Sequence, residues 1–415
     1  MTVQLKRLKR WGVAMAALAL ALAVALPSYG QTSDFSAWLD GVKRDARAAG
    51  ISQATIDAAL TGLEPIERVV ELDRKQPEFT QTFWSYLDNS VTTGRIERAR
   101  RLLAENRPLL DRVYARYGVQ PRFLVAFWGL ESNFGEHTGG YSVIQALATL
   151  AYDARRAAFF RAQLMDALKI IDEGSIAVAD MRGSWAGAMG QLQFIPTTFV
   201  NYAVDFDGDG RRDIWGNLPD VFASAANFLG RVGWRGDETW GREVRLPADF
   251  DWDMASLKTR KPITEWQRLG VRRADGADLP AADIFGAIIV PMGHNGPAFL
   301  VYGNFDAILT WNRSILYAVA VGHLADRIAG LGPLGAERPA GERPLKRAEV
   351  EEIQTLLAVL GFDPGDADGI AGSQTQGALK AFQRQANLVP DGYPSVEALE
   401  GLRQVAAQKA KAKAN

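Results

Sequence analysis

Glu131 is the residue of this chain whose surroundings point most directly to chemistry. It closes the most apolar helix-like run of the sequence, residues 121–134, which begins at Pro121 and is followed by Gly135. Proline suits the first turn of a helix and glycine suits the residue just past its end, so we expect Glu131 in the last turn. There the helix dipole and the apolar neighbours both favour the protonated carboxyl, which is the form that a general acid requires. The alternative interpretation is a solvated glutamate at a helix end.

A second segment, residues 183–199, combines glycines and other small residues with two glutamines, Gln191 and Gln193. Small residues at this density indicate a backbone held close to another helix or to a ligand. A glutamine amide both donates and accepts hydrogen bonds, which suits the hydroxyl and acetamido groups of sugars. The segment therefore indicates either a sugar site or a tight helix-packing site, and its own pattern does not distinguish the two.

The elements that must position these residues are mostly helices. Apolar side chains recur at helical spacing over residues 35–235 and again over residues 304–328. Between residues 239 and 290, short apolar runs are separated by Pro, Asp and Gly, which predicts a small strand-bearing insert. We therefore predict a mainly α fold with a small β insert across residues 31–330.

The C-terminal part of the chain differs in composition. Residues 331–344 are rich in Gly and Pro and too poor in apolar side chains to pack, so we predict a linker. Helical spacing returns in residues 345–404, which predicts a small separate domain, and the Lys- and Ala-rich tail, residues 405–415, is expected to be flexible. With 415 residues, 47% of them hydrophobic, the chain is long enough for two or three domains.

Residues 1–30 have the organisation of a secretory signal peptide: a basic start, an apolar stretch and small residues before Gln31. An uncleaved anchor is the alternative. The segment's four basic residues, once removed, leave 43 basic against 48 acidic residues, a net charge of −5, which gives no reason to expect nucleic-acid binding. The chain has no cysteine for disulfides or lipid attachment. We expect a soluble periplasmic protein of a Gram-negative bacterium, with no membrane anchor after signal removal.

The segment GLESNFG around Glu131, followed further along by GSWAGAMGQLQFIPTTF, resembles the lytic murein transglycosylases of the membrane-bound lytic transglycosylase B type. The resemblance spans about residues 35–328 and includes the block from Asn304 to Tyr317. It implies a lysozyme-like catalytic domain, similar to the goose type, with a helical flanking region and the small β insert.

The resemblance also implies a reaction. The MurNAc–GlcNAc β-1,4 bond of peptidoglycan is cleaved without water, which leaves 1,6-anhydroMurNAc ends. One glutamate, here Glu131, acts first as acid on the glycosidic oxygen and then as base on the C6 hydroxyl. Ordinary glycosidases need two carboxylates, but the sequence places no second acid beside Glu131, and we interpret Glu136, beyond Gly135, as a surface residue. A lone acid is consistent with assistance from the substrate's own acetamido group.

Several residues of the family carry over individually to this sequence. Ser184 and Gln193 match residues that line the cleft beside the acid, and Tyr86 matches an aromatic residue of the sugar-binding groove. Asn312 and Tyr317 match polar residues close to the catalytic glutamate. For each of them the alternative is a structural role in packing or hydrogen bonding.

The remaining correspondences concern charge and stacking. Arg155 and Arg156 match a basic pair placed to meet the peptide or lactyl carboxylates of the substrate. Trp311 and Phe228 each stand where a relative has tyrosine. These two departures keep stacking but remove a hydroxyl, so we rank both lower as ligand contacts.

Residues 205–213 have the opening pattern of an EF-hand loop, with acidic side chains at positions 1, 3, 5 and 9 and glycine at position 6. Gly216 replaces the bidentate glutamate of position 12, and the resemblance implies that a later aspartate closes an expanded calcium loop. The predicted Ca²⁺ ligands are Asp205, Asp207, Asp209, the backbone carbonyl of Arg211, and Asp220. We expect the ion to be structural and expect no organic cofactor. The alternative is a solvated Asp-Gly turn.

Residues 345–404 resemble the small three-helix peptidoglycan-binding module of cell-wall enzymes. The matching pairs include Gly361-Phe362, Asp368-Gly369 and Asp391-Gly392. This resemblance implies a domain that tethers the protein to the wall and raises the local concentration of glycan. A docked structural cap is the alternative.

The expected partners are the glycan strands of peptidoglycan, with other cell-wall enzymes as further candidates. Two other functions stay open at this point. One is a muramidase in which water attacks and a reducing end is left. The other is a non-catalytic wall-binding scaffold, which the apolar setting of Glu131 argues against.

Overall fold

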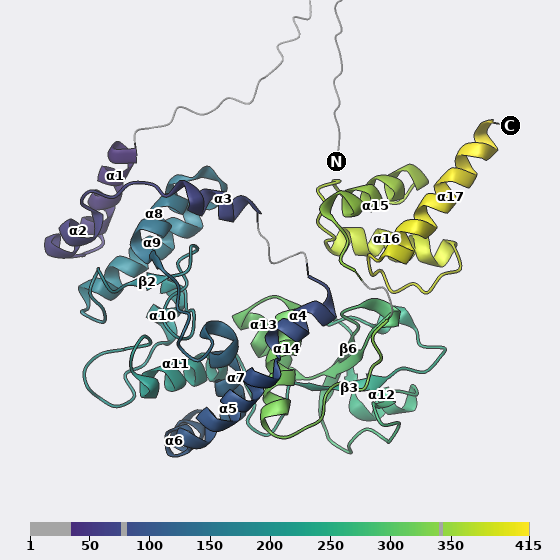
Figure 1. The fold of residues 1–415 in the computed structure, drawn as a ribbon, viewed down its shortest axis with the longest axis horizontal. Helices are drawn as coiled ribbons and strands as arrows, with labels where there is room; N and C mark the ends of the chain where they lie inside the picture. The colour runs from purple at the N-terminus through teal and green to yellow at the C-terminus, as the bar shows by residue number, and fades with distance from the viewer. Residues whose placement is uncertain (1–34, 76–80, 340–342, 415) are drawn as a thin grey trace, which may run out of the picture.

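The computed structural model describes residues 35–75, 81–339 and 343–414, and the predicted signal peptide lies outside them. This part of the chain is mainly helical, which confirms the predicted fold class (Figure 1). None of the described helices is long and apolar enough to pass through a lipid bilayer. The helices that precede the insert are α1 (Phe35–Ala48), α2 (Gln53–Leu60), α3 (Glu67–Lys75), α4 (Phe83–Ser90), α5 (Thr93–Glu105), α6 (Arg107–Tyr117), α7 (Pro121–Ser132), α8 (Val143–Tyr152), α9 (Ala157–Asp172), α10 (Pro196–Tyr202) and α11 (Leu218–Arg231).

Helix α7 lies at the centre of this helical region. Pro121 occupies its first turn, and every residue from Phe123 to Gly129 is buried. A helix that is apolar on all sides must be surrounded by other elements, and α7 packs against α5, α6, α11 and α14 (Ile315–Ile328). Its last turn, which carries Glu131 as the sequence predicts, lies at the edge of this buried region, with Leu130 and Glu131 partly buried.

Two short antiparallel strands hold the glycine-rich segment beside the turn that follows α7. They are β1 (Tyr141–Ser142) and β2 (Arg182–Gly183). Beyond β2 the chain curls back on itself, because Met189 forms bridges on both of its sides. A Cβ on Gly183 would lie 2.1 Å from the carbonyl oxygen of Ala188. The small residues of this segment therefore serve close backbone packing.

The predicted β insert lies between α11 and α13 (Gly303–Trp311) as a five-stranded antiparallel sheet of order β4-β6-β7-β3-β5. Its strands and helices are β3 (Gly241–Arg245), η3 (Trp252–Met254), β4 (Arg260–Pro262), α12 (Ile263–Arg268), β5 (Arg272–Arg273), β6 (Phe285–Ile289), η4 (Gly293–Asn295) and β7 (Ala298–Val301). The sheet continues past residue 290, the predicted end of the insert. The Gly- and Pro-containing turn at residues 291–297 separates β6 from its hairpin partner β7.

The C-terminal domain consists of α15 (Arg347–Leu360), α16 (Ser373–Gln385) and α17 (Val396–Ala414) around a small apolar core of its own. Ile353, Leu379 and Phe382, which have helix-core spacing in the sequence, are buried in this core. The tail expected to be flexible continues α17 as helix to Ala414.

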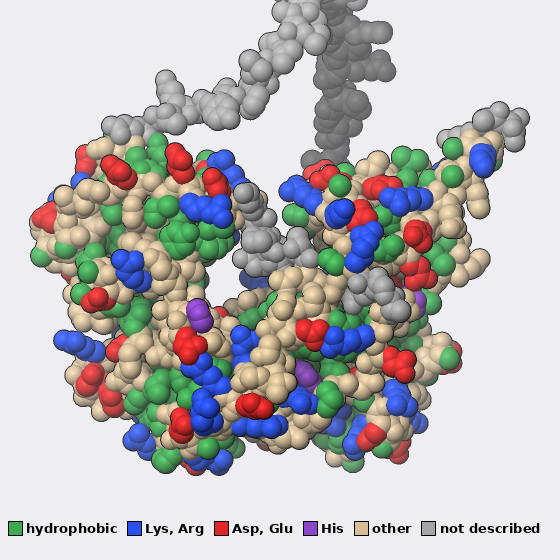
Figure 2. All heavy atoms as spheres, viewed as in Figure 1, with side chains coloured by type: hydrophobic (Ala, Val, Ile, Leu, Met, Phe, Trp, Pro, Cys, Tyr) green, Lys and Arg blue, Asp and Glu red, His purple; other side chains and the backbone are tan. Residues whose placement is uncertain are grey.

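The first part of the predicted linker, residues 331–339, lies against the main region. The amides of Gly335 and Ala336 each donate to the Glu243 carboxylate at 2.7 Å, and Arg338 makes two hydrogen bonds of 2.6 Å to Asp88. On the face shown in Figure 2, acidic and basic side chains are interspersed, in keeping with a net charge close to zero.

Candidate active site

Glu131 lies in the last turn of α7 and is partly buried. The helix ends at Ser132 instead of continuing to Gly135. Asn133, Phe134 and Gly135 all have positive φ, at 50°, 63° and 85°. A bulky residue such as Phe134 rarely adopts this conformation, which costs about 1–3 kcal/mol and persists only where surrounding contacts enforce it. The turn that carries the acid is therefore strained.

Three groups of contacts hold this turn. The exposed carboxylate of Glu136 accepts hydrogen bonds from Asn133 Nδ2 and from Arg98, each at 2.6 Å. The Phe134 ring packs edge-on against Trp128 with ring centroids 5.4 Å apart. It also lies where a Cβ on Gly129 would come within 2.8 Å of two of its atoms. Glu136 is thus a surface residue, as predicted, and its bonds fix the turn.

The Glu131 carboxyl receives two hydrogen bonds on the same oxygen. Trp311 Nε1 donates to Oε1 at 2.8 Å, and the Tyr317 hydroxyl donates to Oε1 as well. None of the described residues donates a hydrogen bond to Oε2. Burial raises the pKa of Glu131 to about 7, although the bonds from Tyr317 and Trp311 oppose this rise. Glu131 is therefore about half protonated near neutral pH and more so at lower pH, so the form that a general acid requires is well populated.

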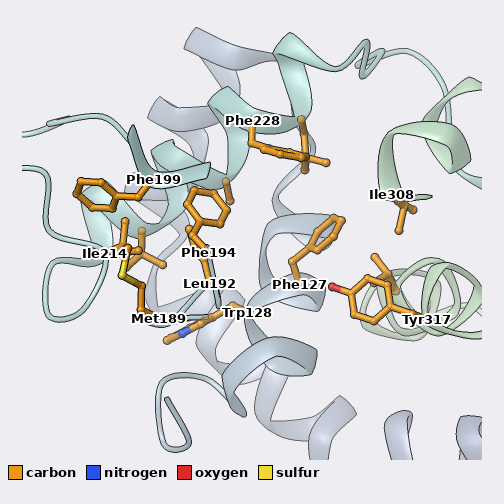
Figure 3. Packing of buried hydrophobic residues seen from close by; sticks show 14 of the residues in the cluster. Phe127, Trp128, Met189, Leu192, Phe194, Phe199, Ile214, Phe228, Ile308 and Tyr317 are labelled. Atoms are coloured by element: carbon orange, nitrogen blue, oxygen red, sulfur yellow. The ribbon is translucent and has the colours of Figure 1, made fainter. Parts of the chain in front are cut away.

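Aromatic side chains from three elements keep the acid in a dry environment. The Trp311 ring lies 4.5 Å from Phe127, 5.2 Å from Phe194 and 5.0 Å from Phe228, measured between ring centroids. Figure 3 shows Phe127, Phe194 and Phe228 converging from α7, the glycine-rich segment and α11, with the Tyr317 hydroxyl directed toward α7. Trp311 ranks low as a ligand contact from its sequence position, yet its indole contacts the acid directly.

Tyr86 and Tyr317 complete the group of polar aromatic residues around the acid. Burial and the neighbouring Glu131 charge raise the pKa of both tyrosines, that of Tyr317 well above its usual range. Both hydroxyls therefore stay protonated and can donate. Asn312, in contrast, is exposed, and its side chain accepts a hydrogen bond from the Ser314 amide at 3.0 Å. The structure brings Tyr86, Trp311 and Tyr317 to Glu131 but gives Asn312 no bond to it.

The two glutamines of the glycine-rich segment have different roles. Gln191 is almost completely buried: its Oε1 accepts from Trp128 Nε1 and its Nε2 donates to the Trp215 carbonyl, both at 2.7 Å. Its backbone carbonyl accepts from the Ser132 hydroxyl, also at 2.7 Å. Gln191 therefore fastens α7 to the loop instead of facing a ligand.

Gln193 and Ser184 lie on the partly exposed side of the same segment. Gln193 has a positive φ of 51°, and its Nε2 donates to the carbonyls of Thr138 and Gly190 at 3.0 and 2.9 Å. The Ser184 hydroxyl oxygen accepts from the Ala188 amide at 3.0 Å. Both side chains shape the loop, and the Gln193 Oε1 makes no hydrogen bond to another described residue. The structure leaves that acceptor available to a ligand.

Arg155 and Arg156 share one partner, the buried carboxylate of Asp73. Burial opposes ionisation of Asp73, but the bonds from the two arginines outweigh it and lower the pKa of that carboxyl. The arginine side chains remain 41% and 39% exposed. This pairing favours the structural interpretation of the basic pair.

Three of the five predicted metal ligands lie together. The carboxylates of Asp205, Asp207 and Asp209 are exposed, with ligand atoms within 4.8 Å of one another. Asp220 is fully buried instead. Its two oxygens accept from the amides of Phe206 and Asp213 at 2.7 and 2.8 Å, which ties both ends of the loop together.

The carboxylate oxygens of this loop fit a hard cation such as Ca²⁺. The loop backbone is already folded around them, because Asp205 accepts from the amides of Gly208 and Gly210 at 2.7 and 2.9 Å. The Arg211 backbone amide donates a hydrogen bond to Asp209 Oδ1 at 2.8 Å. The donor set therefore suits the predicted ion, with Asp220 in a supporting position.

Comparison with known proteins gives matches over most of the chain. Residues 34–326 match the family of the transglycosylase SLT domain, and residues 346–400 match a peptidoglycan binding domain family. Crystal structures of SltB3 from Pseudomonas aeruginosa, in complex with NAG-anhNAM-pentapeptide and with NAG-NAM-pentapeptide, are 47% identical with a TM-score of 0.86. This similarity covers 89% of the chain and 100% of SltB3.

Two other relatives are more distant. The soluble lytic transglycosylase SltB1 from Pseudomonas aeruginosa is 29% identical with a TM-score of 0.62, over 70% of this chain and 98% of SltB1. Membrane-bound lytic murein transglycosylase B of Escherichia coli (strain K12) is 30% identical over 233 residues, which are 53% of this chain. The chain spans 60% of the length of that curated relative.

Proposed function

The chain belongs to the transglycosylase SLT domain family, as its motifs predict, and from that premise we propose that it is a peptidoglycan lytic transglycosylase. The proposed substrate is the MurNAc–GlcNAc β-1,4 bond of the glycan strands. SltB3, which is 47% identical to this chain, is in complex with NAG-anhNAM-pentapeptide and with NAG-NAM-pentapeptide in its crystal structures. The single observation that carries the proposal is the dry, aromatic-lined carboxyl of Glu131, whose pKa of about 7 suits proton transfer in both directions near neutral pH.

In the proposed reaction, Glu131 performs both proton transfers. The neutral acid gives its proton to the glycosidic oxygen as the bond to C1 breaks. The resulting carboxylate then accepts the proton of the C6 hydroxyl as that oxygen bonds to C1, which closes the 1,6-anhydro ring without water. A single acid is supported by the hydrogen bonds on Glu131, which come from Tyr317 and Trp311 and from no second described carboxyl group. Ring closure without water is supported by SltB3, whose crystal structure is in complex with NAG-anhNAM-pentapeptide.

The experiment compares the muropeptides that the wild type and Glu131→Gln release from purified peptidoglycan, by mass spectrometry. We expect wild-type products lighter by one water than their reducing-end counterparts, and none from the variant. Glu105→Gln, on the exposed surface of α5, serves as the matched control and should behave as the wild type. Reducing ends would assign the protein to the muramidases. Release by a folded Glu131→Gln variant would show that the acid is another residue.

We also propose that the loop of Asp205, Asp207 and Asp209 binds Ca²⁺ as a structural ion. Its role follows from position, since the loop fastens α10 to α11 and its carboxylates make no contact with Glu131 among the described residues. When bound, the ion would offset two of the three negative charges of these carboxylates and hold the loop. The loop residues would thereby hold α11 in its orientation, in which Phe228 contacts Trp311.

The remaining expectations concern where the enzyme acts. We propose export to the periplasm through residues 1–30 and binding of the wall by the C-terminal domain. The match of residues 346–400 to a peptidoglycan binding domain supports the second statement. Wall binding can be measured by sedimentation of the full chain with purified peptidoglycan. Glu131→Gln should still sediment in this assay, because it changes cleavage and not binding.

A further inference from the structure

The two hydrogen bonds on Glu131 differ in what their donors can do. A tyrosine hydroxyl both donates and accepts, whereas an indole N–H can only donate. Tyr317 could therefore face either a protonated or an unprotonated carboxyl oxygen. Trp311, whose Nε1 lies 2.8 Å from Oε1, can face only an oxygen that accepts.

From this geometry we propose that Trp311 is a positioning residue that keeps Oε1 of Glu131 as an acceptor and confines the transferable proton to Oε2. The proposal rests on the proposed function and adds which oxygen carries out the chemistry. None of the described residues donates a hydrogen bond to Oε2, so this is the oxygen that can exchange a proton with the substrate. The acid is thereby presented in one orientation.

The indole is held too firmly to turn away. Its ring lies between Phe127, Phe194 and Phe228 at centroid distances of 4.5 to 5.2 Å. It belongs to the last residue of α13, whose end is fixed by a bond from the Asn312 amide to the Ile308 carbonyl at 3.0 Å. A donor that is fixed in this way is preorganised for the charged state of the acid.

The arrangement serves both steps of the cycle. As the glycosidic bond breaks, the proton leaves Oε2 for the leaving oxygen. The new negative charge is shared with Oε1, to which the Trp311 N–H and the Tyr317 O–H already donate. Oε2 then takes the proton of the C6 hydroxyl as its oxygen bonds to C1, and the neutral acid is restored with the proton on the same oxygen. No proton has to move between the two carboxyl oxygens.

The test removes the donor and keeps the ring. In Trp311→Phe, or with the benzothienyl analogue of tryptophan at this position, the N–H is lost while an aromatic ring remains. A donor to a carboxylate lowers its pKa, so its loss raises the pKa of Glu131. We expect kcat to fall by about ten- to a hundredfold, KM to change little, and the alkaline limb of the kcat–pH profile to move to higher pH.

Trp38→Phe is the matched control, because it makes the same change in α1, where the indole ring contacts Phe35 and Tyr152 instead of this cluster. It should leave the alkaline limb in place, and Trp311→Tyr, which restores a donor, should recover part of the wild-type profile. If the benzothienyl variant, which preserves the shape of the ring, keeps the wild-type limb and kcat, the proposal is wrong. If Glu131→Gln is inactive in that case, the proposed function still holds. If Glu131→Gln is active, both the proposed function and the role of Trp311 are wrong.

Discussion

The carboxyl of Glu131 is kept from water by the same aromatic residues that suit it to proton transfer, and this burial lowers the stability of the fold at high pH. The ordinary pKa of the group is 4.5, and burial raises it to about 7 in the folded chain. Between these values the unfolded chain has released its proton while the folded chain retains it. Stability is therefore undiminished below pH 4.5 and is lost as the pH rises to 7, by up to about 3 kcal/mol.

The first prediction follows from this linkage. Glu131→Gln removes the titrating group, so it should be more stable than the wild type at pH 8 by about 1–3 kcal/mol, with the difference declining toward pH 4. Thermal melting of both proteins across this range measures it. Glu105→Gln should melt like the wild type throughout. A difference in melting temperature that does not change with pH would mean that the pKa of Glu131 is the same in the folded and unfolded chains.

At the residue scale, the local pattern of the sequence identifies Glu131 and the family resemblance identifies Tyr317 as its neighbour, whereas Trp311 is ranked low as a ligand contact. Pro121, Gly135 and the apolar run between them lie in one local segment, so their spacing is sufficient to predict Glu131 in the last turn of a helix. Trp311 reaches the acid only because α13 and α14 pack beside α7, and no local pattern reports that contact. The chemistry of the side chain offered a signal, because an indole in an aromatic cluster needs an acceptor for its N–H.

At the scale of elements, the strained turn after α7 connects packing to chemistry. Gly129 lies under the Phe134 ring, and a Cβ there would come within 2.8 Å of two ring atoms. The ring has little freedom to yield, since Phe134 is held at a φ of 63° and packs against Trp128. Overpacking of this kind costs about 1–3 kcal/mol.

The second prediction is that Gly129→Ala lowers the melting temperature and also lowers kcat, because displacement of Phe134 shifts the turn that aims Glu131. The matched control is Gly94→Ala in α5, where the added Cβ meets nothing within 4 Å. That change should be neutral or stabilising by up to about 1 kcal/mol. Unchanged melting and activity in Gly129→Ala would show that the turn tolerates a different conformation.

The acidic loop gives the third prediction. Ca²⁺ should raise the melting temperature and a chelator should lower it, since an ion that binds only the folded state stabilises it by about 3 kcal/mol at a hundred times its Kd. The rate of the folded enzyme should change less than the melting temperature. Asp209→Asn, which can keep the bond to the Arg211 amide but loses a charge, should weaken this response. Asp283→Asn, an exposed change in the insert, should preserve it.

The acidic loop and the glycine-rich segment also show which contacts a local sequence pattern predicts and which depend on packing. The spacing of Asp205, Asp207 and Asp209 predicts three clustered carboxylates, because the pattern is local. Asp220 was predicted as a ligand, but its burial and its bonds to two amides depend on how α11 packs. Gln191 was interpreted as suited to sugars, yet it fastens α7 to the loop, and the same amide chemistry serves either role.

At the scale of the whole molecule, the C-terminal domain is docked on the β insert and does not hang freely from the linker. Arg384 pairs with Asp253, and Lys380 Nζ donates to the Trp252 carbonyl at 2.7 Å. Beside them the His294 ring lies with Nδ1 2.6 Å from Asp391 Oδ2. These contacts join η3 and η4 of the insert to α16 and the turn after it.

The last prediction concerns the pH at which this docking weakens. The bond to Asp391 raises the pKa of His294 above 6.5, with Glu397 adding to the effect and burial beside Trp252 opposing it. The charged pair is thus fully present below pH 6.5 and is lost as the pH rises through the raised value. The radius of gyration from small-angle X-ray scattering should increase over that range, and His294→Ala should be expanded even at pH 6. His137→Ala, an exposed histidine elsewhere, should follow the wild type. A radius independent of pH and of His294 would mean that Arg384, Lys380 and the linker contacts hold the domain without the histidine.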